Sequence, residues 1–219
     1  MNKIRHHKKC PFCDSLDLDL LKVIPLSKDR FASCLQVKDL EEKYNYWFNC
    51  RKCDLRFSSI KLDKNSQNQL YKNYRTLYNS CSSPKDYFER LDSLPEKDSE
   101  NMVKIKILNE SLRNKGSNLK YLNNILDCGC GAGNMLYKLK TIYPNLNCYG
   151  FEPTADFAKF AATILGNNIE NRYIEDYNSK KQFDLITLFH VFEHLLYPIA
   201  ALNKLISLLS KSGYIYIVV

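Results

Sequence analysis

The stretch ILDCGCGAGN, residues 125–134, constrains the fold of this chain more than any other. It places three glycines at alternate positions directly after a short apolar run, and a segment of helical periodicity follows. Because glycine tolerates positive φ and lets the backbone approach a ligand closely, the pattern predicts a ligand-binding turn between a strand and a helix. The turn has the register D-x-G-x-G-x-G, formed by Asp127, Gly129, Gly131 and Gly133.

The same stretch contains Cys128 and Cys130, which raises the alternative of a metal site with two cysteine ligands. On an extended backbone these two side chains would point to one side. No histidine and no further cysteine lies nearby in the sequence, and small side chains suit a tight turn equally well. We therefore favour the turn.

Short apolar runs alternate with helical segments from Tyr121 onward. This alternation is typical of an α/β fold with a doubly wound, parallel, Rossmann-like sheet. The predicted strands are ILDC, NCYGFE, FDLITLF and GYIYIVV, and the predicted helices are NMLYKLKTIY, ADFAKFAATILG and PIAALNKLISLLS.

Three zones divide the chain. Residues 1–61 contain two C-x-x-C pairs and an aromatic strand, YNYWF, at 44–48. Residues 62–120 are polar and read as a helical linker or lid, and residues 121–219 form the α/β domain. Within the linker, a helix is expected from about Ser99 to Lys115, with Asp98 or Ser99 as its cap and Gly116 at its end. Its apolar stripe consists of Met102, Ile105, Leu108 and Leu112.

Four of the nine cysteines form the two C-x-x-C pairs. Two such pairs can close a tetrahedral zinc site, and here the ligands would be Cys10, Cys13, Cys50 and Cys53. The 36 residues between the pairs exceed the usual spacing of about 15–20, so an insertion is needed. Cys34 lies in that insertion and is expected to be free. A redox role for the pairs is the alternative.

Acidic residues follow the glycine turn at intervals that suit the binding of an adenosine. Glu152 stands at the tip of the next predicted strand, 19 residues after Gly133. A carboxylate there can accept hydrogen bonds from both ribose hydroxyls of an adenosine. Glu175, beside Asp176, would close the far side of an adenine pocket, although a solvated loop is an equal alternative.

The segment FDLITLFHVFEHL places three titratable residues after a predicted strand, where open α/β sheets bind ligands. In a helical turn His190 can approach either Glu193 or His194. A histidine with a pKa near neutrality suits a general base, and a neighbouring carboxylate can orient it. His194 is the expected base and Glu193 its partner; the alternative is that one histidine only packs under the ligand and Glu193 only caps a helix.

These motifs together resemble the class I S-adenosylmethionine-dependent methyltransferases over residues 121–219. The matching segments are DCGCGAG, FEP and FDLITLFHVFEHL. The resemblance implies that Asp127 and the glycines line the methionine portion of the cofactor, that Glu152 binds its ribose and that the segment at Ile174–Glu175 touches its adenine. A dinucleotide-binding domain shares only the glycine turn and the following acid.

The resemblance also implies a seven-stranded sheet, whereas GYIYIVV reads as the fifth strand. We therefore expect a methyltransferase fold that is incomplete at its C-terminus, either truncated or completed from elsewhere. Its last strand would then be an exposed edge. An inactive remnant that binds the cofactor, or nothing, is one hypothesis that follows.

A zinc-ribbon-like module ahead of such a domain resembles the sugar C-methyltransferases of nucleotide-linked deoxysugars and their relatives in polysaccharide pathways. The resemblance implies a small-molecule acceptor, a sugar or nucleotide-sugar, with S-adenosylmethionine and zinc as cofactors. An RNA methyltransferase is the alternative, because most of the formal charge of +8 falls in residues 1–80. The wide spacing of the cysteine pairs counts against it. No membrane span or secretory signal is recognisable, so a cytoplasmic protein is expected.

Overall fold

A computed structural model describes residues 5–29, 44–70 and 83–219 of the chain. Contacts between Cα atoms divide the chain into two compact units, Met1–Ser80 and Cys81–Val219. Cys34, expected to be a free cysteine, lies outside the described residues. Among the described residues, no helix combines the length and apolar character that a membrane crossing requires.

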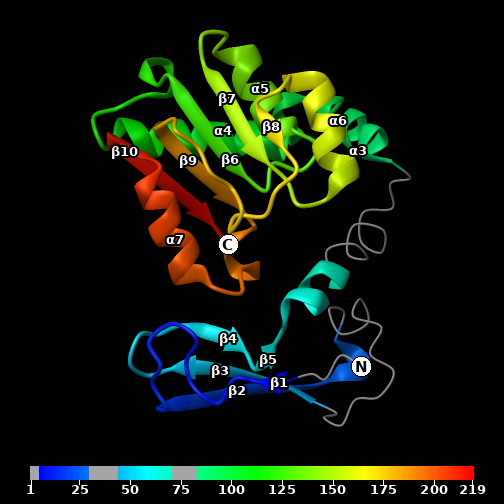
Figure 1. Cartoon of the computed structure of the whole chain (residues 1–219), viewed down its shortest axis with the longest axis vertical. Helices are drawn as coiled ribbons and strands as arrows, with labels where there is room; N and C mark the ends of the chain where they lie inside the picture. The colour runs from blue at the N-terminus through cyan, green and yellow to red at the C-terminus, as the bar shows by residue number, and fades with distance from the viewer. Residues whose placement is uncertain (1–4, 30–43, 71–82) are drawn as a thin grey trace. The chain divides into compact units, whose positions relative to one another are not determined.

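The first unit is built on two small antiparallel sheets (Figure 1). One sheet pairs β1 (Arg5–His6) with β5 (Ile60–Lys61), and the other has the order β2 (Leu18–Pro25), β3 (Tyr44–Cys50), β4 (Arg56–Ser58). A 3-10 turn, η1 (Leu26–Lys28), follows β2. The predicted aromatic strand at 44–48 is confirmed as the first part of β3. The core of this unit consists of Cys10, Cys50 and Phe57, with Phe48 and Leu55 packed against them.

The second unit begins with helices that precede its sheet. These are α3 (Pro84–Asp92) and α4 (Glu100–Arg113), separated by the 3-10 turn η2 (Glu96–Asp98). The predicted helix at 99–115 is confirmed: the hydroxyl of Ser99 accepts from Met102 N–H as the N-cap, and Gly116 has φ +76° just beyond the end. Three of the four predicted stripe residues are buried. The predicted linker at 62–120 is thus divided between the two compact units.

The main sheet has five parallel strands in the order β10-β9-β6-β7-β8 (Figure 1). The α/β fold with a parallel sheet expected from the sequence is therefore confirmed. Its elements in chain order are η3 (Leu119–Tyr121), β6 (Asn124–Cys128), α5 (Asn134–Ile142), β7 (Asn147–Phe151), α6 (Ala155–Leu165), β8 (Ile169–Glu170), β9 (Phe183–Phe189), η4 (Phe192–His194), α7 (Pro198–Ser207) and β10 (Leu209–Val218).

Two buried clusters cover the two faces of this sheet. One joins residues of α4, α5 and α6 to the sheet, and the other joins α7 to it (Figure 1). Cys130 belongs to the first cluster and Cys128 to the second. The expectation that these two cysteines point to one side is wrong, because Gly129, between them, takes φ +73° and ends the extended path. Both thiols are buried parts of the core, which leaves no pair of ligands for one cation.

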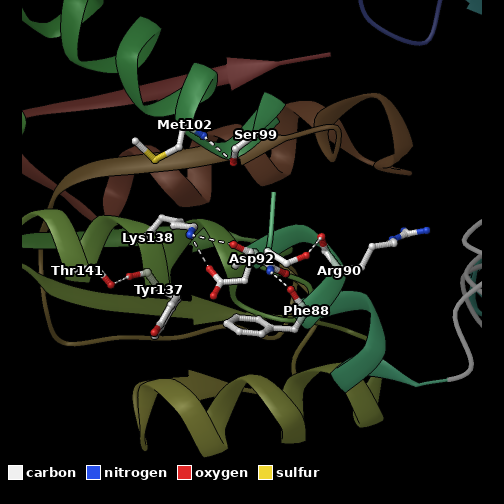
Figure 2. A network of polar contacts seen from close by, with 10 residues as sticks. Phe88, Arg90, Asp92, Ser99, Met102, Tyr137, Lys138 and Thr141 are labelled. Atoms are coloured by element: carbon white, nitrogen blue, oxygen red, sulfur yellow. Dashed lines mark hydrogen bonds and ion pairs between the residues drawn. The ribbon is translucent and has the colours of Figure 1, made fainter. Parts of the chain in front are cut away.

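Helix α3 is fastened to α5 by polar and aromatic contacts. The ammonium of Lys138 pairs with Asp92 Oδ1 at 2.6 Å (Figure 2). The side chain of Asn134, the first residue after the glycine turn, donates from Nδ2 to the Phe88 carbonyl at 3.0 Å. The Phe88 ring meets Tyr137 edge-on at 5.3 Å between ring centroids. The helix that follows the glycine turn is thereby anchored at its start.

Candidate active site and cysteine cluster

The glycine turn lies between the end of β6 and the start of α5. Gly129, Gly131 and Gly133 have φ values of 73°, 59° and 85°, a region that glycine enters at little cost. The N–H groups of Gly129 and Cys130 both donate to the carbonyl of Phe151 at the end of β7, at 2.8 and 3.1 Å. The turn is therefore fixed by the neighbouring strand, and its largely buried backbone leads into a helix N-terminus, a place that suits polar ligand groups.

Space as well as conformation demands glycine in this turn. A Cβ at Gly129 would lie 2.7 Å from Val191 Cγ2, and one at Gly133 would lie 2.8 Å from Leu165 Cδ1. Val191 follows the end of β9, so this contact places the predicted catalytic segment directly against the glycine turn. The two motifs, more than fifty residues apart in the sequence, form one site.

Asp127 is a buried carboxylate on β6, with 4% of its surface exposed. Its Oδ1 accepts from the Thr187 hydroxyl at 2.7 Å, across the parallel pairing of β6 with β9. Desolvation raises the pKa of Asp127 to about 7, while Thr187 and Lys104 act to lower it and Glu152 to raise it. Because a buried anion is costly without a positive partner, this carboxylate suits a cationic ligand group such as an ammonium.

Sequence reasoning overlooked Thr187. The signal was available: it is the one hydroxyl in the apolar run FDLITLF. The strand order, which places β9 beside β6, shows why a polar residue stands there.

Glu152 directly follows β7 and is almost fully buried, with 2% of its surface exposed. Its Oε2 accepts from Gly131 N–H at 3.0 Å and its Oε1 from Thr154 N–H at 2.9 Å. Both carboxylate oxygens thus accept from backbone N–H groups, which fix the side chain beside the glycine turn. The backbone carbonyl of Glu152 accepts from Asn171 Nδ2 at 2.8 Å. Like the contact of Thr187 with Asp127, this one was not predicted from the sequence.

The segment expected to close the far side of the pocket is a turn after β8. Ile174 is buried, Glu175 is half-buried and Asp176 is exposed. The carbonyl of Glu175 accepts from the ammonium of Lys204 on α7 at 2.6 Å, which ties the turn to that helix. Burial, and then the negative charges of Glu175, Glu152 and Asp176, raise the pKa of Tyr173. Tyr173 therefore faces the same acidic region as Glu152.

The predicted catalytic residues gather at the end of β9. His190 has φ +54°, uncommon outside glycine, and its N–H donates to the carbonyl of Val218 at 2.8 Å. Its Nδ1 lies 3.6 Å from Glu193 Oε1, and Nε2 of His194 lies 4.0 Å from the same oxygen. Of the two predicted neighbours of His190, the structure brings Glu193 close. One carboxylate thus stands between two imidazoles.

The two histidines differ in their surroundings. The side chain of His194 is 31% exposed and that of His190 is 53% exposed. Desolvation by burial lowers the pKa of His194, against the negative charge of Glu193, which acts to raise it. A neutral imidazole at physiological pH can accept a proton, so the surroundings of His194 suit a general base.

Each C-x-x-C pair in the first unit ends in the same tight turn. In both, the N–H four residues after the first cysteine donates back to that cysteine's carbonyl, at 3.0 Å for Asp14 and 2.8 Å for Asp54. Both aspartates have positive φ, 58° and 59°. The two pairs therefore form matching loops that direct their thiols alike.

The four thiols meet at one point. The Sγ atoms of Cys10 and Cys53 are 3.6 Å apart, those of Cys13 and Cys50 are 3.5 Å apart, and all four lie within 4.8 Å of one another. Four sulfurs at the Zn–S distance of about 2.3 Å form a tetrahedron with edges of about 3.8 Å. The donor set and its dimensions therefore fit a tetrahedral metal ion.

The four thiols differ in how readily they lose their protons. Desolvation acts to raise the pKa of the Cys50 thiol, but hydrogen bonds from the backbone of Cys53 and Lys52 and from the thiols of Cys13 and Cys53 outweigh it and lower the pKa to about 7. Burial and hydrogen bonds within the cluster raise the pKa of Cys53 to about 12 and also raise that of Cys13. Cys50 is therefore the member of the cluster most inclined to the thiolate form, which is the form that binds metal.

The parallel sheet has a glycine turn after β6, the acidic Glu152 after β7 and the polar segment at His190 after β9. This arrangement is typical of α/β proteins that bind a cofactor. Residues 83–219 match the family model described as a methyltransferase domain. The match covers more than half of the chain, and the chain belongs to this family.

Solved structures with the same fold include two complexes of the plantazolicin methyltransferase BpumL, one with a pentazolic and one with a triazolic desmethylPZN analogue, each with SAH. Their TM-scores are 0.54 and 0.53, with 21% and 19% sequence identity. In both cases the similarity covers 69% of this chain and 57% of BpumL, so the chain spans little more than half the length of that enzyme. No curated protein matches the chain.

Proposed function

We propose that the chain binds S-adenosylmethionine at the glycine turn and transfers its methyl group to a small-molecule acceptor, a sugar or a nucleotide-linked sugar. The observation that supports this most is the carboxylate of Glu152, which is buried directly after β7 and is fixed to Gly131 N–H of the glycine turn at 3.0 Å. Membership of the methyltransferase domain family agrees with it.

The residues fit the cofactor group by group. The carboxylate of Glu152 accepts hydrogen bonds from the ribose hydroxyls. Asp127, whose pKa is raised to about 7 by burial, pairs with the amino group of the methionine portion. Tyr173 and Glu175 line the adenine end, and the glycine turn lets the backbone approach the cofactor.

When bound, S-adenosylmethionine would supply a methyl group activated by its sulfonium, and transfer of that methyl to the acceptor atom would release the thioether S-adenosylhomocysteine. The protein holds the acceptor in line and accepts its proton. His194 is the proton acceptor, since burial lowers its pKa, and Glu193 orients it from 4.0 Å. His190 approaches the other side of the same carboxylate at 3.6 Å.

The cysteine cluster holds a structural zinc ion in this proposal. All four positions of the metal are filled by Cys10, Cys13, Cys50 and Cys53, so the ion has no open site for chemistry. Its role is to hold together a unit whose core contains few buried apolar side chains.

Calorimetric titration of the full chain with S-adenosylmethionine tests the cofactor site. We expect saturable binding that Glu152→Gln weakens about tenfold or more, because hydrogen bonds to a charged group contribute about 1.5–3 kcal/mol. Glu170→Gln is the matched control, as Glu170 lies on β8 and pairs with Arg172. The cofactor site is wrong if the wild type does not bind, or if Glu152→Gln binds as tightly as Glu170→Gln.

The acceptor class needs a separate assay. Methyl transfer from labelled S-adenosylmethionine to nucleotide-linked sugars supports the proposal. Transfer to RNA instead, with an RNA affinity that falls steeply with salt, would contradict it.

A further inference from the structure

Helix α4 brings two charged side chains to the end of β9. Glu100 opens this helix, beside the capping Ser99, and Lys104 lies one turn later. The ammonium of Lys104 pairs with Glu100 Oε1 at 2.6 Å and lies 5.2 Å above the ring centre of Phe189. The Lys104 side chain is only 19% exposed and lies between the helix and the strand end, whereas the Glu100 side chain that it pairs with is 68% exposed.

Glu100 faces the predicted catalytic segment. Its Oε1 is 4.0 Å from Nε2 of His190, while Glu193 Oε1 is 3.6 Å from Nδ1 of the same ring. The hydrogen bond from His190 N–H to Val218 and the positive φ fix the direction in which this ring leaves the backbone. A carboxylate near each ring nitrogen restrains the orientation of the His190 ring.

We propose that Glu100, held by Lys104, is a positioning residue of the acceptor side of the site, acting on His190 from α4. This inference rests on the proposed function, because His190 belongs to the proposed catalytic set. Neither Glu100 nor Lys104 belongs to a motif of the sequence, and both precede the glycine turn by more than twenty residues.

Charged groups lie on both sides of His190. Carboxylates face it from α4 and from η4, His194 is its histidine neighbour, and Lys104 offsets part of the charge of Glu100. His190 and His194 both lie near the same Glu193 oxygen, at 3.6 and 4.0 Å. Glu193 in turn orients His194, which burial keeps neutral and ready to accept a proton.

Lys104 also reaches the cofactor side of the site. Its positive charge acts to lower the pKa of Asp127. A single pair of residues on α4 therefore acts electrostatically on the carboxylate proposed for the cofactor and on the histidine proposed for the acceptor side. This explains why a lysine with a largely buried side chain occupies the helix face that covers the sheet.

The test is the orientation of the His190 ring, followed by the NMR chemical shifts of its imidazole protons in the full chain with S-adenosylhomocysteine present. The chain has four histidines, so His190→Gln assigns the signals. We expect Glu100→Gln to shift the His190 signals, because it removes a charged carboxylate 4.0 Å from Nε2. Glu110→Gln, near the other end of the same helix, makes the same change in net charge and should leave the signals unchanged.

The outcomes separate this inference from the proposed function. If S-adenosylhomocysteine binds but the His190 signals are the same in Glu100→Gln and Glu110→Gln, Glu100 has no role and the cofactor site stands. If S-adenosylhomocysteine does not bind to the wild type, the proposed function fails. Shifted His190 signals in Glu100→Gln alone, with unchanged affinity for S-adenosylhomocysteine, support the positioning role.

Discussion

Gly129→Ala should destabilise the second unit through two separate effects. Gly129 has φ +73°, which an alanine adopts only with strain. The added Cβ would also lie 2.7 Å from Val191 Cγ2, closer than Cβ atoms approach other atoms in folded proteins. The substitution therefore tests whether the glycine turn and the end of β9 are packed against each other.

The expected loss in the free energy of unfolding is the sum of these two effects. A left-handed conformation costs a non-glycine residue about 1–2 kcal/mol, and overpacking costs about 1–3 kcal/mol, so Gly129→Ala should cost about 2–5 kcal/mol. Gly116→Ala is the matched control. It has a similar φ of +76° but nothing within 4 Å of its added Cβ, so it should cost only the first part, about 1–2 kcal/mol.

Urea unfolding with two probes separates the units. The one tryptophan is Trp47 on β3, so its fluorescence follows the first unit, whereas circular dichroism follows the helices, most of which lie in the second. Gly129→Ala should shift the circular dichroism transition to lower urea and leave the Trp47 transition unchanged. The free energy of unfolding follows from the midpoint and slope of each transition.

A second substitution isolates the clash. In the Gly129→Ala background, Val191→Ala removes the two methyl groups that the new Cβ meets, and should recover the overpacking part of the loss. Equal costs for Gly129→Ala and Gly116→Ala, with no recovery from Val191→Ala, would refute the contact between the turn and β9.

Three further predictions concern pH, metal and catalysis. Burial raises the pKa of Asp127 from about 3.9 when unfolded to about 7, so the folded unit binds an extra proton between these values and loses stability as pH rises through them. Below pH 7 a cationic ligand must displace this proton, so the affinity for S-adenosylmethionine should weaken by up to about tenfold for each unit by which the pH is lowered. An equally steep loss of affinity in Asp127→Asn would rule this out. Cys50→Ser should lose zinc by elemental analysis, while Cys148→Ala, in the core of the second unit, keeps it; equal metal in both would discard the zinc site. His194→Asn should slow methyl transfer more than tenfold with S-adenosylhomocysteine affinity unchanged, and full activity would exclude the base role.

The strands and helices of the second unit could largely be predicted because local signals coincide there with tertiary packing. FDLITLF became β9 at its predicted bounds, and the helix starting at Ser99 has both its cap and its apolar stripe. Strand β8 was not predicted. It consists of Ile169 and Glu170 alone, and a strand of two residues is too short to show a hydrophobic pattern.

The site was predictable only where its residues form motifs along the chain. The glycines, Glu152 and the segment at His190 follow spacings that a sequence displays. Thr187, Asn171 and Glu100 do not, because their contacts with Asp127, Glu152 and His190 arise from strand order and helix packing. The placement of Cys128 and Cys130 on different faces likewise depends on one dihedral angle, at Gly129, that no residue count reveals.

A crystal structure of the chain soaked with S-adenosylhomocysteine tests the central claim most directly. The account predicts the ligand along the turn from Gly129 to Gly133, with its ribose hydroxyls bound to the Glu152 carboxylate and its amino group beside Asp127. Crystals that take up the ligand elsewhere, or that show an empty crevice at this turn, would contradict it.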